Sequence, residues 1–196
     1  ANNLQNFPVG IFAIPFALAV FPTLAHHAVK EENSVFIENF SKAIRQTLYF
    51  ILPSSVLLII LRAQIVRVVL GAGKFDWEDT ILTFQALGIF ALSLFAQGLI
   101  PLLARSFYAI QNTRIPFFTG LVGEIVNVVL AIYLAQIYGV LGLVWAFTVA
   151  SIVNMGLLFF ILNRKMDVFA DKKIISSIFR ISLATVVAGS IAQAAK

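Results

Sequence analysis

Long apolar runs alternate with short polar segments along this chain. Six runs stand out, at residues 4–24, 44–61, 81–104, 116–135, 140–162 and 174–194. An α-helix rises ~1.5 Å per residue, so about 20 apolar residues are needed to cross a hydrocarbon core of ~30 Å. All six runs approach or meet that length, and the second continues into a mixed segment that ends near residue 70. The pattern predicts six transmembrane helices.

Composition favours the same fold class. The chain is 60% apolar and 12% charged, whereas about 25% of the residues of a soluble domain are charged. A soluble helical bundle would need polar helix faces, which these runs lack. A transmembrane β-barrel would show alternating segments of ~10 residues instead of continuous apolar runs. We therefore expect an all-α, polytopic transmembrane helix bundle.

The basic residues are unevenly distributed between the connectors. Cytoplasmic loops of membrane proteins are enriched in Lys and Arg, so the richer side is predicted to face the cytoplasm. The connectors on the other side hold Lys74 and Lys196, with Arg62 and Arg67 if the second helix ends early. The connectors after the first, third and fifth runs hold Lys30, Lys42, Arg45, Arg105, Arg114, Arg164, Lys165, Lys172 and Lys173.

Several functional classes are disfavoured by what the sequence contains. The net charge of +5 comes from these separate loops, which does not indicate a nucleic-acid surface. The chain has no cysteine, so thiolate metal sites are excluded. His26 and His27 are adjacent, which on a helix places them about 100° apart and suits no shared metal. No phosphate loop, zinc motif or nucleophile elbow is present, so we expect no enzyme, metal or cofactor.

The first apolar run combines prolines with an amide-rich start. Pro8, Pro15 and Pro22 are spaced by seven residues, which predicts that they lie nearly on one helical face. Each proline removes a helical hydrogen bond, and the freed carbonyls need neighbours or water in a cavity. The run is either a bent packing element or a helix beside a polar cavity. Asn3 and Gln5, just before Pro8, are then candidates for lining such a cavity.

Glu124 is the residue with the clearest chemical potential. It falls near the middle of the fourth run, and Asn127 follows one turn later on the same face. A carboxylate at mid-membrane costs about 2.5–3.5 kcal/mol on insertion scales, so it should face a cavity or a partner. Two interpretations remain open: Glu124 couples transport to a proton or cation, or it is protonated and bonds a neighbouring helix. Asn154 is expected to form an interhelical hydrogen bond.

The connector between the third and fourth runs has the most distinctive sequence in the chain, R-S-F-Y-A-I-Q-N-T-R-I-P over residues 105–116. We expect Arg105 and Arg114 to set the topology and to contact anionic lipid head groups, worth ~1 kcal/mol each. Tyr108 is expected to anchor at the interface. Pro116 is expected to begin the next helix.

At this point the sequence resembles a known family, the C-terminal part of the MurJ/MviN lipid II flippases of the multidrug/oligosaccharidyl-lipid/polysaccharide exporter superfamily. Each matching piece is short, but their order and spacing together are specific. The pieces are Asn6–Phe12, Val20–Leu24, Leu52–Ser55, Gly73–Phe75 with Asp79–Thr80, Arg105–Ala109, Asn112–Pro116, Asn127, Gly139–Leu143 and Asn154.

The resemblance implies a fold and a function. The family has fourteen spans in two lobes, and this chain would supply spans eight to thirteen. Such proteins move undecaprenyl-pyrophosphate-linked peptidoglycan precursor across the bacterial plasma membrane by alternating access around a cationic cavity. Asn3 stands where family members typically carry an arginine of that cavity, five residues before Pro8, and Glu124 stands at a position expected to be uncharged.

These two departures leave alternatives open. The protein could export other lipid-linked oligosaccharides or cationic drugs, or it could be a membrane scaffold that binds cell-wall synthesis proteins without transport. Membrane lipids are expected partners in every case.

Overall fold

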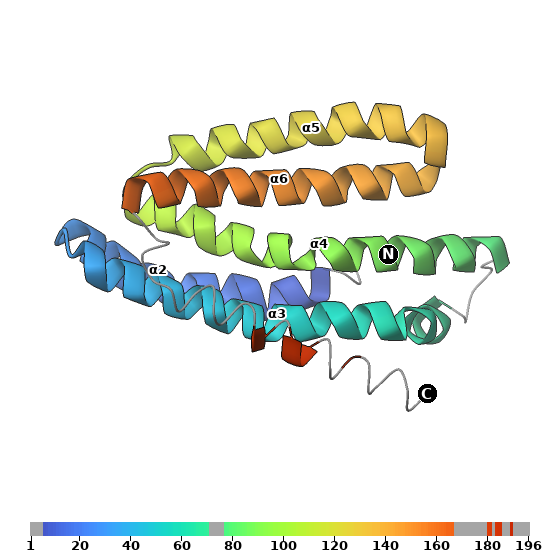
Figure 1. Ribbon diagram of the computed structural model, residues 1–196, viewed down its shortest axis with the longest axis horizontal. Helices are drawn as coiled ribbons and strands as arrows, with labels where there is room; N and C mark the ends of the chain where they lie inside the picture. The colour runs from blue at the N-terminus through green and yellow to red at the C-terminus, as the bar shows by residue number, and fades with distance from the viewer. Residues whose placement is uncertain (1–5, 71–76, 167–179, 182, 186–188, 190–196) are drawn as a thin grey trace.

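The computed structural model describes residues 6–70 and 77–166, and in the C-terminal segment residues 180, 181, 183–185 and 189. Every element in these residues is helical, which confirms the predicted all-α fold (Figure 1). In chain order the elements are η1 (Val9–Ala13), α2 (Ile14–Val29), α3 (Asn33–Leu70), α4 (Trp77–Ala109), α5 (Arg114–Tyr138) and α6 (Val140–Met166).

The described residues contain five helices long and apolar enough to cross a membrane. They are Asn6–Val29, Asn33–Val66, Thr80–Ala109, Arg114–Tyr138 and Val140–Met166. The predicted sixth span, 174–194, falls mostly outside the described residues. The helices extend beyond the apolar runs at most ends, because a helix can continue past the hydrocarbon where its backbone groups bond internally.

The second helix differs most from its expected bounds. We expected it over 44–61 with a mixed extension to 70, whereas α3 begins already at Asn33. Its early turns carry a buried stripe of Phe36, Phe40 and Ala43, the i, i+4, i+7 spacing of an amphipathic helix. Lys42 therefore lies on α3, paired with Glu38 at 2.8 Å (Lys Nζ to Glu Oε1), and does not lie in a loop.

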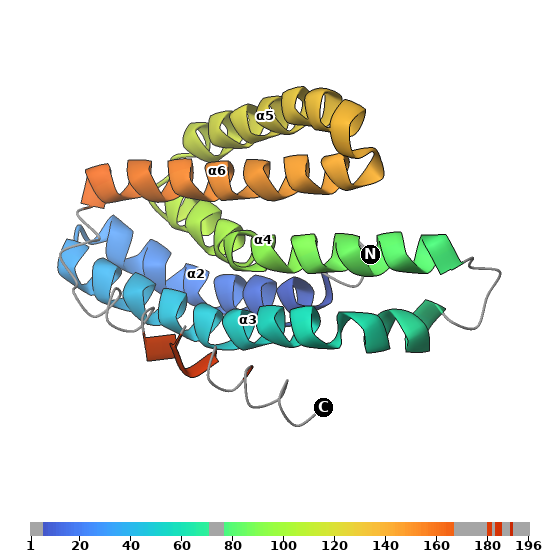
Figure 2. The same cartoon turned by 45° about the vertical axis from the view of Figure 1, so that its right-hand side comes forward.

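Helix α4 is the central element. In Figures 1 and 2 it runs between the α5–α6 pair on one side and α2 and α3 on the other. In its most apolar stretch 67% of the residues are buried, against 11% in α5. Helix α5 packs almost entirely on α6. The fold is thus two layers joined through α4.

Glycine lets α3 approach α4 closely. A Cβ atom at Gly98 would lie 2.9 Å from Ile51 Cγ1 of α3, and one at Gly88 would lie 2.6 Å from Arg62 Nη1. On the other side of α4, Thr148 Oγ1 of α6 donates to the Ile89 carbonyl at 3.5 Å. Small residues at helix contacts are the usual means of tight packing in membranes, where no hydrophobic effect drives helices together.

Contrary to the prediction, the three prolines of the first span do not lie on one helical face. Pro8 is buried, whereas Pro15 and Pro22 are exposed. The cause is the π-helical turn η1, in which the Ile14 N–H bonds to the Val9 carbonyl five residues back. A π-turn holds an extra residue, so it shifts the phase of the residues before it relative to those after it.

A short turn joins α2 to α3 at Lys30–Glu32. His27 Nδ1 donates to Glu32 Oε2 at 2.6 Å. This hydrogen bond holds the pKa of the Glu32 carboxyl below its usual value. Glu31 adopts a left-handed backbone conformation (φ 57°), which lets the chain reverse within a few residues.

The turn between α5 and α6 depends on two glycines. Gly139 ends α5 with φ 57° and donates its N–H to the Ala135 carbonyl at 2.9 Å. Gly142 is buried in the first turn of α6, where a Cβ atom would overlap the backbone carbonyl of Leu134. The two helices can therefore cross closely only if residue 142 has no side chain.

We predict that Gly142→Ala lowers the free energy of unfolding by about 1–3 kcal/mol, the usual cost of overpacking. Thermal unfolding of the intact protein in detergent micelles measures this effect. Gly156→Ala is the matched control on the same helix, because nothing lies within 4 Å of its added Cβ. Equal unfolding temperatures for the two variants would contradict the tight crossing.

Candidate functional site

A small polar cavity lies between η1, α4, α5 and α6. Its volume is about 260 Å³, and Glu124 and Asn127 of α5 both line it. Polar groups also reach it from Gln97 of α4 and from Ser151 and Asn154 of α6. The remaining lining residues are Val9, Ile100, Pro101, Gly123, Phe147 and Ala150.

Glu124 is held by its own helix. Its Oε2 accepts a hydrogen bond of 3.5 Å from Asn127 Nδ2, one turn along α5. Among the described residues, no hydrogen bond joins Glu124 to a neighbouring helix. The carboxyl group is exposed, with one weak hydrogen bond to an amide. Glu124 therefore contributes an exposed carboxyl group to the lining of the cavity.

Asn154 contributes a polar atom that the described residues leave without a partner. Its Oδ1 is buried and accepts no hydrogen bond from them. A buried acceptor without a donor costs about 1–3 kcal/mol. We expected an interhelical hydrogen bond from this residue, but its carbonyl oxygen makes none with the described part of the chain. The cavity therefore contains an acceptor that a ligand or water could satisfy.

Two features of the backbone keep this cavity open. Gly123 is buried against Asn154, and a Cβ atom there would lie 3.1 Å from Asn154 Cβ. Pro101 has no N–H for the helical hydrogen bond at its level of α4, and α4 bends in this region (Figure 2). Any side chain at position 123 would reduce the space between α5 and α6.

The structure describes some, but not all, of the cavity residues that the sequence predicted. Asn3 and Gln5 lie outside the described residues. Pro8 is buried at the start of η1, and the next residue, Val9, lines the cavity. The structure thus brings the first span, Glu124 and Asn127 to one place. In the part of the chain that the structure describes, no three His, Cys, Asp or Glu side chains gather to hold a metal ion.

The connector is shorter than expected, because both flanking helices continue into it. Arg105 and Tyr108 belong to the last turns of α4, and Arg114 and Pro116 belong to the first turn of α5. Only 110–113 form the turn, with Gln111 in a left-handed conformation (φ 55°). A backbone hydrogen bond from Asn112 N to the Phe107 carbonyl (2.9 Å) closes it.

The four connector residues have different surroundings. The Arg105 guanidinium lies 5.9 Å from the ring centroid of Phe21 on α2, so it contributes to helix packing as well as to charge. Pro116 does not begin α5, which starts two residues earlier. Asn112 caps α5 instead, since its Oδ1 accepts the Ile115 N–H at 3.2 Å. Tyr108 and Arg114 are exposed and line one surface cavity together.

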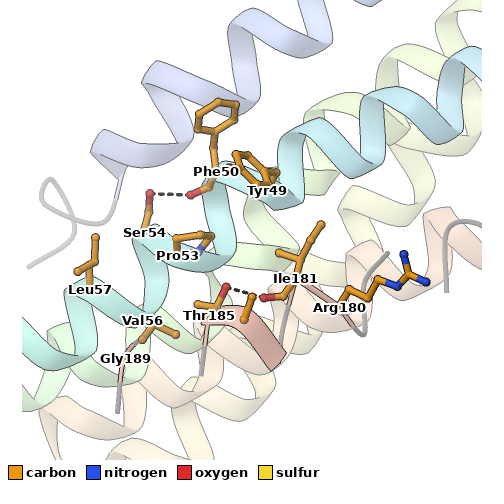
Figure 3. Close-up of a pocket in the computed structure, with 11 residues that line it drawn as sticks. Tyr49, Phe50, Pro53, Ser54, Val56, Leu57, Arg180, Ile181, Thr185 and Gly189 are labelled. Atoms are coloured by element: carbon orange, nitrogen blue, oxygen red, sulfur yellow. Dashed lines mark hydrogen bonds between the residues drawn. The ribbon is translucent and has the colours of Figure 1, made fainter. Parts of the chain in front are cut away.

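A second, larger pocket was not expected from the sequence. It has a volume of about 610 Å³ and lies between α3 and the described residues of the C-terminal segment (Figure 3). Pro53 lies inside α3 beside it, and Ser54 Oγ donates to the Phe50 carbonyl at 2.7 Å. Apart from Arg180 at one end the lining is largely apolar, with Tyr49, Phe50, Val56, Leu57 and Ile181.

One signal for this pocket was present in the sequence. Pro53 stands inside an apolar run, and a proline inside a helix removes a hydrogen bond and bends the chain. Tertiary packing decides which helix lies beside the bend, and no local sequence pattern predicts that helix.

Known proteins share the sequence pattern and the fold of this chain. A family described as lipid II flippase MurJ matches residues 1–196. A probable lipid II flippase MurJ from Thermotoga maritima is 32% identical over 191 residues, covering 97% of this chain and 38% of the relative. The lipid II flippase MurJ of Thermosipho africanus is 29% identical over 160 residues, covering 82% of this chain and 33% of that protein.

A solved structure shows the same fold. A lipid II flippase MurJ in an inward closed conformation superposes with a TM-score of 0.82 at 28% identity, covering 97% of this chain and 38% of that one. The chain thus spans less than two-fifths of the length of these relatives. With a family match over its full length and a shared helical fold, the chain belongs to the lipid II flippase MurJ family.

Proposed function

We propose that the protein moves a lipid-linked peptidoglycan precursor, lipid II, across the bacterial plasma membrane. The observation that carries this proposal is the family match over residues 1–196. The relatives named as lipid II flippases are longer, so this chain would supply one part of the transporter. A pyrophosphate-linked head group is charged and cannot cross hydrocarbon unaided.

The mechanism we propose is alternating access. Transporters of this kind rock one group of helices against another around a site near the membrane midplane. The layered arrangement around α4 and the prolines at positions 53 and 101 suit such a movement, because proline interrupts the helical hydrogen bonds that resist bending. In this proposal the ends of α2, α4 and α6 face the cytoplasm, following the distribution of basic residues.

Within this mechanism we assign the polar cavity to coupling and to contact with the substrate. Glu124 would bind a proton or a cation, with Asn127 and Asn154 as neutral oxygen donors beside it. Asn3, Gln5 and Pro8 would border the same cavity on the first span. Cell-wall synthesis proteins would be partners of the intact transporter.

Complementation tests the function directly. The intact protein, produced in a bacterium whose own lipid II flippase is depleted, should restore growth and normal cell shape. A protein that inserts well into the membrane but fails to rescue would contradict the proposal. Such a failure would instead favour export of another lipid-linked oligosaccharide or of drugs, or a scaffold without transport.

Glu124→Gln tests the coupling role. The variant keeps the size of the side chain and its bond to Asn127 but removes the charge. We expect lipid II flipping in vesicles to slow by about tenfold or more, since a contact to a charged group is worth ~1.5–3 kcal/mol. The dependence of flipping on pH or sodium should also disappear.

Glu38→Gln is the control for this experiment, because Glu38 lies on α3 beside Lys42 and far along the chain from the cavity. A Glu124→Gln variant that transports as fast as the unmodified protein, with the same dependence on pH and sodium, would remove the coupling role.

Filling the cavity tests its participation independently of charge. Gly123→Leu should reduce transport strongly, because the new side chain enters the space between Glu124 and Asn154. Gly120→Leu is the matched control on the same helix, with nothing within 4 Å of its added Cβ. Similar transport rates for the two variants, both well inserted, would show that the cavity is not used.

A further inference from the structure

We propose that a cavity at the α4–α5 turn binds the phosphate of an anionic phospholipid. The cavity has a volume of about 490 Å³ and opens at the surface. It joins residues on both sides of the turn: Tyr108 from α4, Thr113 from the turn, and Arg114, Pro116, Phe117 and Phe118 from α5. The proposal requires that α5 crosses the membrane, but it does not rest on the proposed transport function.

Arg114 supplies the charge. Its guanidinium group is exposed, and no described carboxylate lies within ion-pair distance of it; the described ion pairs involve only Glu32 and Glu38. A guanidinium group binds phosphate oxygens through two parallel hydrogen bonds.

The other arginines at this end of the bundle are placed differently. Arg105 lies over the Phe21 ring, and Arg164 lies 5.0 Å from the ring centroid of Phe160. The start of α5 and the end of α6 lie side by side there (Figure 1). Charge alone would make Arg105, Arg114 and Arg164 equivalent, but only Arg114 among them lines this cavity.

Two residues that carry hydroxyl groups, Tyr108 and Thr113, line the same cavity as Arg114. Thr113 occupies the N-cap position of α5 but makes no side-chain capping hydrogen bond. Asn112 caps the helix instead, through its Oδ1. The Thr113 hydroxyl therefore does not cap α5. Tyr108 is 43% exposed. Hydroxyl and phenol groups donate to phosphate oxygens and would complete the contacts made by Arg114.

The apolar side of the cavity points to a lipid rather than to a soluble phosphate compound. Phe117 and Phe118 are 66% and 59% exposed, at the start of a helix whose outer face continues with exposed Leu121, Val122 and Ile125. Aromatic side chains prefer the membrane interface, between head groups and acyl chains. A phosphate on Arg114 would therefore have its acyl chains along the apolar face of α5.

Native mass spectrometry of the intact protein with phosphatidylglycerol or phosphatidylcholine tests the site. We expect preferential retention of phosphatidylglycerol, weakened about fivefold in Arg114→Gln, as for loss of one basic residue at a lipid surface. Thr113→Val should weaken it less. Arg164→Gln removes the same charge at the same end of the bundle and should leave retention unchanged.

Three results would overturn the proposal. Equal losses in Arg114→Gln and Arg164→Gln would show general attraction of lipid to charge. Equal retention of both lipids by the unmodified protein would show that no anionic head group is recognised. Displacement of the bound lipid by millimolar inorganic phosphate would show a site for soluble phosphate. None of these measurements involves transport, so a failure here is distinguishable from a failure of the flippase assignment.

Discussion

Close packing around α4 is the constraint on which the rest of this structure depends. In a membrane, helices gain little from burying apolar surface against each other, so their association relies on close contact and interhelical hydrogen bonds. Gly88 and Gly98 let α3 reach the α4 backbone, and Thr148 joins α6 to it. Because α5 packs almost entirely on α6, its position also depends indirectly on α4. The polar cavity lies where η1, α4, α5 and α6 meet, so its shape depends on this packing.

The sequence predicted the fold class because the dominant physical requirement is local. Each membrane-spanning helix must satisfy its own backbone hydrogen bonds and present apolar side chains over a fixed length. Both properties depend on residues that are consecutive in the sequence. Boundaries were less predictable. Helix α3 begins at Asn33 because Phe36, Phe40 and Ala43 pack on neighbouring helices, and an average over an apolar run does not detect such a stripe.

The candidate site was predictable only in part, for the same reason. A carboxylate in an apolar run identified Glu124, and helical spacing placed Asn127 beside it. That Gly123 and Asn154 share a cavity with them depends on how α5 and α6 cross. The different roles of Arg105 and Arg114 likewise depend on where Phe21 lies after folding. In the sequence, Arg105 and Arg114 have the same charge and the same expected position at the membrane interface, so the sequence does not distinguish their roles.

The π-turn at Val9–Ala13 has a consequence for how the first span could change during evolution. One extra residue in a helix rotates everything on one side of it by about 100° relative to the other side. The wider π-turn absorbs such a residue, so deleting one residue between Val9 and Ala13 would restore a regular helix and leave Pro8 facing as it does now relative to Pro15 and Pro22. The first span can therefore gain or lose one residue at this turn while the side chains on both sides of it keep their orientation toward the neighbouring helices.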